Sequence, residues 1–273
     1  MPDSQPPGPL DEAIQAALAR SAAMRPLGFF FDFDGVLAPI QDEPASARPL
    51  AGLTVQLEQL ATMVEKVAIV SARPVDFLAG HFAGSSRISL FGLYGLETRI
   101  DGTVERNNAA ASWDSTIGEV TQAARRELPD DVLVEEKPLS VALHYRKQPR
   151  HRRTVEDWAE RKAGQYGLAQ QHGRMVVELK PPTSIDKGTV LAGEITGLRC
   201  AWYFGDDISD VKGFAALHEQ QADNRDFRGV CVAVENSGIV AELEQQADFV
   251  LASPLKIQEL LRHAIELISA GQP

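Results

Sequence analysis

The chain has 273 residues, of which 44% are apolar and 24% are charged, values typical of a water-soluble globular protein. Its formal charge of −11 argues against non-specific binding to nucleic acid, and it contains no apolar run of about 18 residues that would span a membrane. The first 25 residues lack the basic start and apolar stretch of a secretory signal. We therefore expect a cytoplasmic protein.

The charge is unevenly distributed along the chain. Residues 106–180 carry a net charge of +2, whereas the remainder carries −13. In the acidic remainder of the chain, carboxylates at strand ends could hold a divalent cation. The slightly basic segment 106–180 could bind an anionic substrate. Two solvated surfaces of different composition explain the same numbers equally well.

Five apolar runs predict strands that are buried on both faces of a parallel sheet. They cover residues 27–33, 66–70, 88–93, 200–204 and 229–234. Segments with helical periodicity lie around them, at residues 10–23, 49–64, 74–82, 186–196, 208–220 and 254–270. Alternating strands and helices predict an α/β fold with a doubly wound, Rossmann-like parallel sheet.

The middle of the chain breaks this alternation. Its pattern predicts a helix, two strands, a second helix and two more strands, at residues 108–128, 132–136, 140–145, 149–166, 168–171 and 175–179. Turns are expected at Lys137-Pro138 and at His172-Gly173. We predict an inserted α+β domain over residues 106–185, a core domain over 27–105 and 186–273, and an N-terminal extension over 1–26.

The two cysteines, Cys200 and Cys231, are too few for a disulfide scaffold or a multi-cysteine metal site. Each lies in an apolar run that predicts a buried strand. We interpret both as small core residues in a reducing compartment.

Two carboxylates follow the first apolar run directly, in the sequence Asp32-Phe33-Asp34-Gly35. Ligands of open α/β sheets bind at the carboxyl ends of the strands, and residues two apart on a strand share a face. One carboxylate could attack a phosphorus atom while the other moves protons for the leaving alcohol and the attacking water. A loop aspartate pair that caps a helix is the structural alternative.

The fourth core strand also ends in carboxylates, in the sequence Asp206-Asp207-Ile208-Ser209-Asp210. Three such groups within five residues repel one another unless a cation joins them, and Mg²⁺ prefers oxygen ligands. Asp206 could bind the cation together with Asp32, and Asp210 could be a further ligand or hold a metal-bound water. Helix capping explains at least one of these residues as well.

Two further polar groups are predicted at strand ends. Ser71, Ala72 and Arg73 follow the second strand, and a hydroxyl with backbone amides at a helix start suits a phosphate oxygen. Lys187 opens the helix before the fourth strand, where its ammonium could neutralise a phosphoryl group. A serine cap and an exposed lysine are the plainer interpretations.

In this order the motifs resemble those of the haloacid dehalogenase superfamily, and more closely those of the trehalose-6-phosphate phosphatase family. The matching segments are Asp32-Phe33-Asp34-Gly35-Val36-Leu37, Ser71-Ala72-Arg73-Pro74, Gly92-Leu93-Tyr94-Gly95-Leu96-Glu97, Glu135-Glu136-Lys137, His144-Tyr145-Arg146, Glu178-Leu179-Lys180-Pro181 and Gly205-Asp206-Asp207 through Asp210. The likeness covers roughly residues 27 to 260, nearly the whole chain.

The resemblance implies hydrolysis of trehalose 6-phosphate with Mg²⁺ as cofactor. It makes Asp32 the nucleophile, Asp34 the general acid and base, and Lys187 a stabilising cation. The remaining roles fall to three groups of residues: Ser71 and Ala72 bind phosphate; Asp206 and Asp210, with Asp32 and the Asp34 carbonyl, bind the metal; Arg73, Glu97, Lys137, His144, Arg146 and Glu178 contact the substrate.

The sequence departs from the family pattern at three positions. Val36 replaces a usual threonine, Ala72 a usual glycine and Tyr94 a common histidine. The last change puts strict specificity for trehalose in question. The alternatives are a phosphatase for another glycoside phosphate, a non-catalytic sugar-phosphate binder and a phosphomutase. We expect a monomer that binds a small sugar phosphate, with neither nucleic acid nor membrane as a partner.

Overall fold

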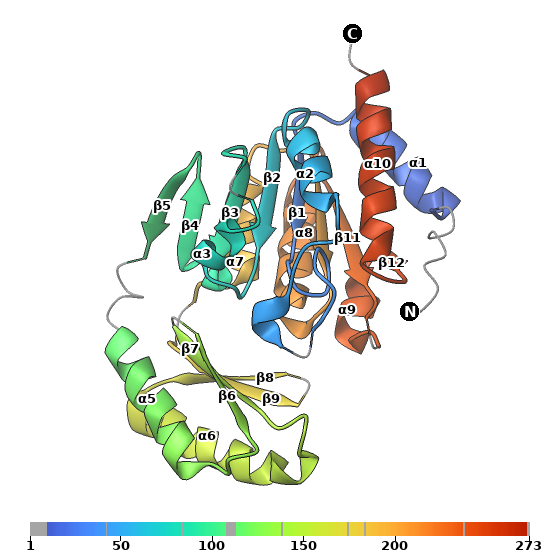
Figure 1. Cartoon of the computed structure of the whole chain (residues 1–273). Helices are drawn as coiled ribbons and strands as arrows, with labels where there is room; N and C mark the ends of the chain where they lie inside the picture. Colours follow the sequence, from blue (N-terminus) through green and yellow to red (C-terminus); the bar gives the residue numbers. More distant parts are fainter. Residues whose placement is uncertain are drawn as a thin grey trace. The chain divides into compact units, whose positions relative to one another are not determined.

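A computed structural model of the chain describes residues 10–271 except 42, 83, 108–112, 138, 174, 183 and 237. The chain divides into two compact units (Figure 1). The larger unit consists of Met1–Glu105 and Ile185–Pro273, and the inserted unit is Arg106–Ser184.

The larger unit is built on an eight-stranded sheet with the strand order β12-β11-β10-β1-β2-β3-β4-β5. Its strands are β1 Leu27–Phe31, β2 Lys66–Val70, β3 Ile88–Gly92, β4 Glu97–Ile100, β5 Thr103–Arg106, β10 Cys200–Gly205, β11 Arg228–Val234 and β12 Phe249–Leu251. The six strands from β12 to β3 pair in parallel, and β4 is antiparallel to β3. The α/β fold class and the doubly wound order predicted from the sequence are confirmed.

The central strand β1 pairs in parallel with β10 on one side and β2 on the other. All five of its residues are buried, which explains its continuous apolar sequence. Phe31 stacks on Phe204 of β10 with ring centroids 4.7 Å apart, and the ring of Phe29 stacks on Trp202 at 6.1 Å. These contacts fix the adjacent carboxyl ends of β1 and β10 relative to each other.

Helices cover both faces of this sheet (Figure 1). One face packs against α1 Glu12–Ala22, α2 Leu53–Ala61, α3 Val75–Ala79 and α10 Leu255–Ala270. The other packs against α7 Lys187–Glu194, α8 Val211–Asp223 and α9 Ala241–Gln246. Helix α1 belongs to the core, because Ile14 and Leu18 are buried and Ser21 Oγ accepts a 2.9 Å hydrogen bond from Trp202 Nε1. No helix within the described ranges has both the length and the apolar composition needed to cross a membrane.

The inserted unit is a four-stranded antiparallel sheet with the strand order β6-β7-β9-β8. Its elements are α5 Asp114–Glu127, β6 Leu133–Lys137, β7 Ser140–His144, α6 Arg152–Tyr166, β8 Ala169–Gly173 and β9 Val176–Lys180. Apolar side chains from alternate strand positions, such as Val141, Leu143 and Val177, pack against both helices. The opposite face carries both polar side chains, such as Glu135, His144 and Glu178, and apolar ones, such as Ala142 and Val176.

Several local expectations need correction. The turn predicted at His172-Gly173 is wrong, because both residues pair with β9 and the reversal occurs beside Met175, whose φ is +65°. Strands β4, β5 and β12 and helix α9 were not predicted, because they are short or mostly exposed. The turn predicted at Lys137-Pro138 is wrong at Lys137, which is the last residue of β6 and pairs with Ser140. Residues 108–112 of the predicted helix and Pro138 of this turn lie outside the described residues.

Candidate active site

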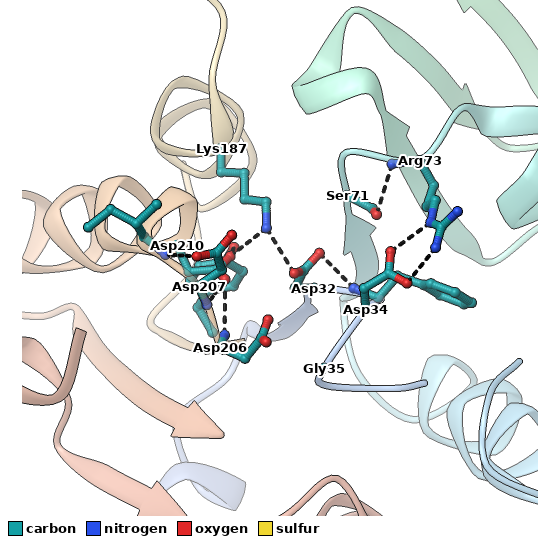
Figure 2. Close-up of polar contacts among 12 residues, drawn as sticks. Asp32, Asp34, Gly35, Ser71, Arg73, Lys187, Asp206, Asp207 and Asp210 are labelled. Atoms are coloured by element: carbon teal, nitrogen blue, oxygen red, sulfur yellow. Dashed lines mark hydrogen bonds and ion pairs between the residues drawn. The ribbon is translucent and has the colours of Figure 1, made fainter. Parts of the chain in front are cut away.

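Carboxylates from two neighbouring strands meet at the carboxyl edge of the larger sheet. Asp32 follows β1 and Asp206 follows β10, and the Asp32 amide donates a 2.9 Å hydrogen bond to the Phe204 carbonyl. The parallel pairing of β1 with β10 therefore continues up to Asp32, where the first acidic loop begins. Figure 2 shows Asp32 between the loop that carries Asp34 and the loop that carries Asp206.

Asp32 is almost fully buried, with only 6% of the residue exposed. Its Oδ2 lies 3.0 Å from Lys187 Nζ, and its Oδ1 accepts a 2.7 Å hydrogen bond from the Phe33 amide. Burial raises the pKa of Asp32 to about 8, against the lowering effect of Lys187 and with smaller raising effects of Asp210 and Asp34. A neighbouring cation would favour the ionised carboxylate of Asp32.

Lys187 stands at the first position of α7 and is 1% exposed. Its Nζ contacts Asp32 Oδ2 at 3.0 Å and Asp210 Oδ1 at 2.6 Å. Burial by itself would lower the pKa of Lys187, but attraction by Asp210 and then Asp32 outweighs it and raises that pKa well above 10.5. The side chain is therefore a fixed positive charge that joins two carboxylates.

Asp210 is completely buried and accepts bonds on both carboxylate oxygens (Figure 2). Lys187 and the Tyr203 hydroxyl donate to Oδ1, and the amides of Asp206 and Asp207 donate to Oδ2 at 3.0 Å each. Asp210 therefore holds both the turn after β10 and the Lys187 side chain in position. Tyr203 could not be identified as a site residue from the sequence, because it lies within an apolar run and resembles an ordinary core residue.

A second residue missed by the sequence analysis is Asn236, which follows β11. Its Nδ2 donates to Asp206 Oδ2 at 3.0 Å and to the Gly35 carbonyl at 3.1 Å. Gly35 has a φ of +80°, and a Cβ there would lie 2.0 Å from Asp206 Oδ2. Only glycine leaves room for the Asp206 carboxylate. The position of Asn236 after a predicted core strand was the one available signal.

Asp32, Asp206 and Asp210 each offer an oxygen within 4.8 Å of the others. Burial, followed by repulsion from Asp32 and Asp210, raises the pKa of Asp206 well above 3.8. Such a cluster of hard oxygen donors has unbalanced negative charge that a divalent cation would relieve. The donor set therefore fits a cation of the Mg²⁺ type.

Asp34 has different surroundings from Asp32. Its side chain is 29% exposed and forms a two-pronged ion pair with Arg73, with Nε–Oδ2 and Nη2–Oδ1 distances of 2.7 and 2.8 Å. The Arg73 guanidinium also lies 4.7 Å from the ring centroid of Phe77. Arg73, expected to contact substrate, thus holds the second carboxylate in place.

The phosphate-binding segment expected after β2 lies beside this pair. Ser71 is 1% exposed, and its Oγ accepts a 3.1 Å hydrogen bond from the Arg73 amide. The turn after β3 packs on the same segment, because the Tyr94 amide donates to the Ser71 carbonyl at 2.9 Å. Tyr94 adopts a left-handed φ of +61°, and Ala72 is half-buried.

Glu97, expected to contact the sugar, lies at the start of β4. Its Oε2 accepts a 3.0 Å hydrogen bond from the Val75 amide at the start of α3. The carboxylate thus caps a short helix, a local role that the sequence analysis did not assign to it.

Three of the four residues expected in the inserted unit share the sheet face opposite its helices. Glu178, which is 7% exposed, lies 3.3 Å from Lys137 Nζ and accepts a hydrogen bond from the Ser140 hydroxyl. Burial would raise the pKa of Glu178, but Lys137 and then Ser140 outweigh it and lower that pKa. His144 Nε2 lies 2.9 Å from Glu135 Oε2 on the same face. Arg146 follows β7 and is exposed.

The larger unit thus brings together most of the residues that the sequence selected: Asp32, Asp34, Ser71, Arg73, Lys187, Asp206 and Asp210 (Figure 2). Lys137, His144, Arg146 and Glu178 belong to the inserted unit.

Comparison with known proteins gives the family. The family model described as trehalose-phosphatase matches residues 30–248, which is most of the chain. The chain belongs to the trehalose-phosphatase family. It is similar to the trehalose-phosphate phosphatase of Mycolicibacterium paratuberculosis, with 33% identity over 276 residues, and to that of Mycobacterium marinum, with 35% identity over 277 residues. Each match covers 96% of this chain, which spans 68% of each relative's length.

Solved structures show that this member of the trehalose-phosphatase family shares its fold with known proteins. The C-terminal domain of trehalose-6-phosphate phosphatase from C. albicans superposes with a TM-score of 0.74 and 19% identity, covering 97% of this chain and 99% of that domain. A haloacid dehalogenase-like hydrolase from Bacteroides thetaiotaomicron superposes with a TM-score of 0.58 and 15% identity. The match covers 88% of this chain and 98% of that hydrolase. These similarities establish the fold.

Proposed function

We propose that this chain is a magnesium-dependent phosphatase that hydrolyses trehalose 6-phosphate to trehalose and phosphate through an aspartyl-phosphate on Asp32. The observation that carries the proposal is the contrast between Asp32 and Asp34, two carboxylates at the end of one strand. Asp32 is buried against Lys187, whereas Asp34 is partly exposed and held by Arg73. Different surroundings for two nearby carboxylates are the usual basis for different roles in one reaction.

In the first step an Asp32 oxygen attacks the phosphorus atom, and the bond from phosphorus to the sugar oxygen breaks. Asp34 donates a proton to that oxygen, so that trehalose leaves as a neutral alcohol. In the second step Asp34 removes a proton from a water molecule, which attacks the phosphorus and releases Asp32 and phosphate. Two bonds from Arg73 hold the ionised Asp34 carboxylate in position, and one of them can remain while the other oxygen carries the transferred proton.

The phosphoryl group needs hydrogen-bond donors and positive charge. The Ser71 hydroxyl and the Ala72 amide supply donors at the end of β2, and Lys187 supplies a buried ammonium. Asp32, Asp206 and Asp210, with the Asp34 carbonyl, would hold Mg²⁺, which when bound balances the charge that develops on the phosphoryl oxygens. Asn236 fixes the Asp206 carboxylate for this purpose.

The sugar requires polar groups that distinguish hydroxyl positions. We assign this role to Lys137, His144, Arg146 and Glu178 of the inserted unit, and to Glu97 of the larger unit. Lys137, His144 and Glu178 lie on one face of the inserted sheet. Ion pairs on that face already orient their side chains. A carboxylate accepts hydrogen bonds from sugar hydroxyls, and lysine and arginine donate them.

The test measures phosphate release from trehalose 6-phosphate with and without Mg²⁺. Asp32→Asn is expected to abolish release, and Asp226→Asn provides the control because Asp226 is an exposed aspartate before β11 with no contact to the acidic cluster in the described contacts. Release that depends on Mg²⁺ and Asp32 and is selective for trehalose 6-phosphate supports the proposal. Release only from another glycoside phosphate retains the mechanism and replaces the substrate, with Tyr94 as the first position to examine. No release from any sugar phosphate rejects the proposal.

A further inference from the structure

The larger unit contains a second group of metal-ligating side chains, formed by His218, Cys231 and Asp248. His218 lies on α8, Cys231 lies on β11, and Asp248 immediately precedes β12. This group shares no residue with the acidic cluster at the ends of β1 and β10. None of the three has a role in the proposed phosphatase reaction.

The one sulfur–nitrogen distance in this group agrees with tetrahedral metal coordination. The thiol Sγ of Cys231 lies 3.6 Å from His218 Nε2, and the three donor atoms lie within 4.8 Å of one another. A tetrahedral zinc ion has Zn–S bonds of about 2.3 Å and Zn–N bonds of about 2.0 Å, which place the sulfur and nitrogen roughly 3.6 Å apart. The sulfur and the nitrogen already have this separation.

Each of the three metal-ligating side chains comes from a different part of the fold. Cys231 is fully buried where α8 covers β11, and its amide donates a 2.9 Å hydrogen bond to Asp248 Oδ2. This bond orients the carboxylate beside the sulfur, as outer hydrogen bonds orient metal ligands. Asp248 Oδ1 lies 3.9 Å from Arg228 Nη2, a long ion pair that competes weakly with a cation.

His218 and Asp248 are exposed, whereas Cys231 is fully buried. An imidazole, a thiolate and a carboxylate together carry two negative charges, which balance a divalent cation. Sulfur and imidazole donors favour zinc and similar transition metals over Mg²⁺, which prefers oxygen.

We propose that His218, Cys231 and Asp248 form a binding site for a zinc-type divalent cation, with water as the fourth ligand. Binding releases the thiol proton to solvent and joins α8, β11 and the start of β12 through one ion. The site is separate from the proposed phosphatase centre, and neither proposal depends on the other.

Cobalt(II) is the probe, because a thiolate ligand gives it a charge-transfer absorption in the near ultraviolet. The full chain is freed of metal with a chelator, supplied with excess Mg²⁺ and titrated with Co²⁺. Oxygen donors alone do not give this absorption, so Co²⁺ bound at Asp32, Asp206 and Asp210 does not interfere. We expect the absorption to saturate at one Co²⁺ per chain and to disappear when Zn²⁺ is added.

Variants assign the absorption to His218 and Cys231. His218→Ala is expected to weaken Co²⁺ binding by about 100-fold or more, and Cys231→Ser to remove the absorption. Glu219→Ala is the matched control, because Glu219 is the next position on α8 and is also exposed. Cys200→Ser tests the other cysteine. Circular dichroism establishes that each variant is folded.

The proposal is supported if Glu219→Ala and Cys200→Ser retain the absorption while His218→Ala and Cys231→Ser lose it. No absorption in the wild-type protein, or an unchanged titration in His218→Ala, would overturn it and leave a thiol–imidazole contact without a metal. If Cys231→Ser or Cys200→Ser does not fold, the comparison of His218→Ala with Glu219→Ala decides, because both positions are exposed.

Discussion

Replacing Gly35 by alanine tests how the turn after β1 accommodates the carboxylate of Asp206. Gly35 has a φ of +80°, and an added Cβ would lie 2.0 Å from Asp206 Oδ2 and 2.8 Å from Asn236 Nδ2. The left-handed backbone costs alanine about 1–2 kcal/mol. The overlap also forces the carboxylate to move, and a displacement of about 1 Å at a catalytic site lowers turnover about 100-fold. We therefore expect a modest loss of stability and a large loss of activity.

Gly52→Ala separates these two effects. Gly52 has a φ of +83°, and no atom lies within 4 Å of an added Cβ, so this variant carries the backbone cost without the overlap. Urea unfolding measures stability, and phosphate release over a range of Mg²⁺ concentrations measures activity. We expect Gly52→Ala to lose about 1–2 kcal/mol of stability, and Gly35→Ala to lose at least as much because the overlap adds to the backbone cost. Only Gly35→Ala should lose turnover and require more Mg²⁺. Normal activity of Gly35→Ala, or an equal loss in Gly52→Ala, would refute the reasoning.

Three further predictions follow from individual contacts. Asn236→Ala leaves the Asp206 carboxylate without its amide donor, so the Mg²⁺ concentration for half-maximal activity should rise about 10- to 100-fold; an unchanged Mg²⁺ titration counts against this role. Arg73→Lys removes one of the two bonds to Asp34 and should lower kcat about tenfold, whereas an unaltered kcat would show that the second bond does not position the carboxylate. Glu178 has a pKa below its usual 4.5 in the folded protein, so it contributes stability above that pH and loses the contribution as the pH falls through the folded value. Glu178→Gln should therefore be less stable than wild type at pH 7 in thermal unfolding, with a difference that shrinks below about pH 4.5; a constant difference would contradict the assignment.

The central strands could be predicted from the sequence because burial on both faces leaves a continuous apolar run. Residues 27–31 of β1 show this directly, with all five residues buried. The edge strands β4 and β5 have mostly exposed or half-buried residues and carry no such run. Strand β12 has three residues, which is too short for a periodic pattern. Their place in the sheet depends on pairing with distant strands rather than on local sequence.

The site could be predicted in part for a related reason. Asp32 and Asp206 each follow a predicted strand, so parallel pairing alone places them together. Tyr203 and Asn236 were missed because their roles come from contacts with Asp210 and Asp206, and neither side chain is unusual in its local sequence. The pairing of Arg73 with Asp34 could not be predicted, because it joins residues 39 positions apart in the chain; a substrate contact of Arg73 stays a prediction.

The central claim is that Asp32 becomes phosphorylated during turnover. Asp34 serves both steps, so its replacement would slow formation of the adduct as well as its hydrolysis, and the wild-type protein is the one to trap. The measurement is mass spectrometry of peptides from wild-type protein quenched with acid during turnover of trehalose 6-phosphate with Mg²⁺. We predict a single phosphoryl adduct on the peptide that contains Asp32, absent when Asp32 is replaced by asparagine. A phosphoryl adduct on a different residue, or phosphate release by Asp32→Asn at the wild-type rate, would contradict the claim.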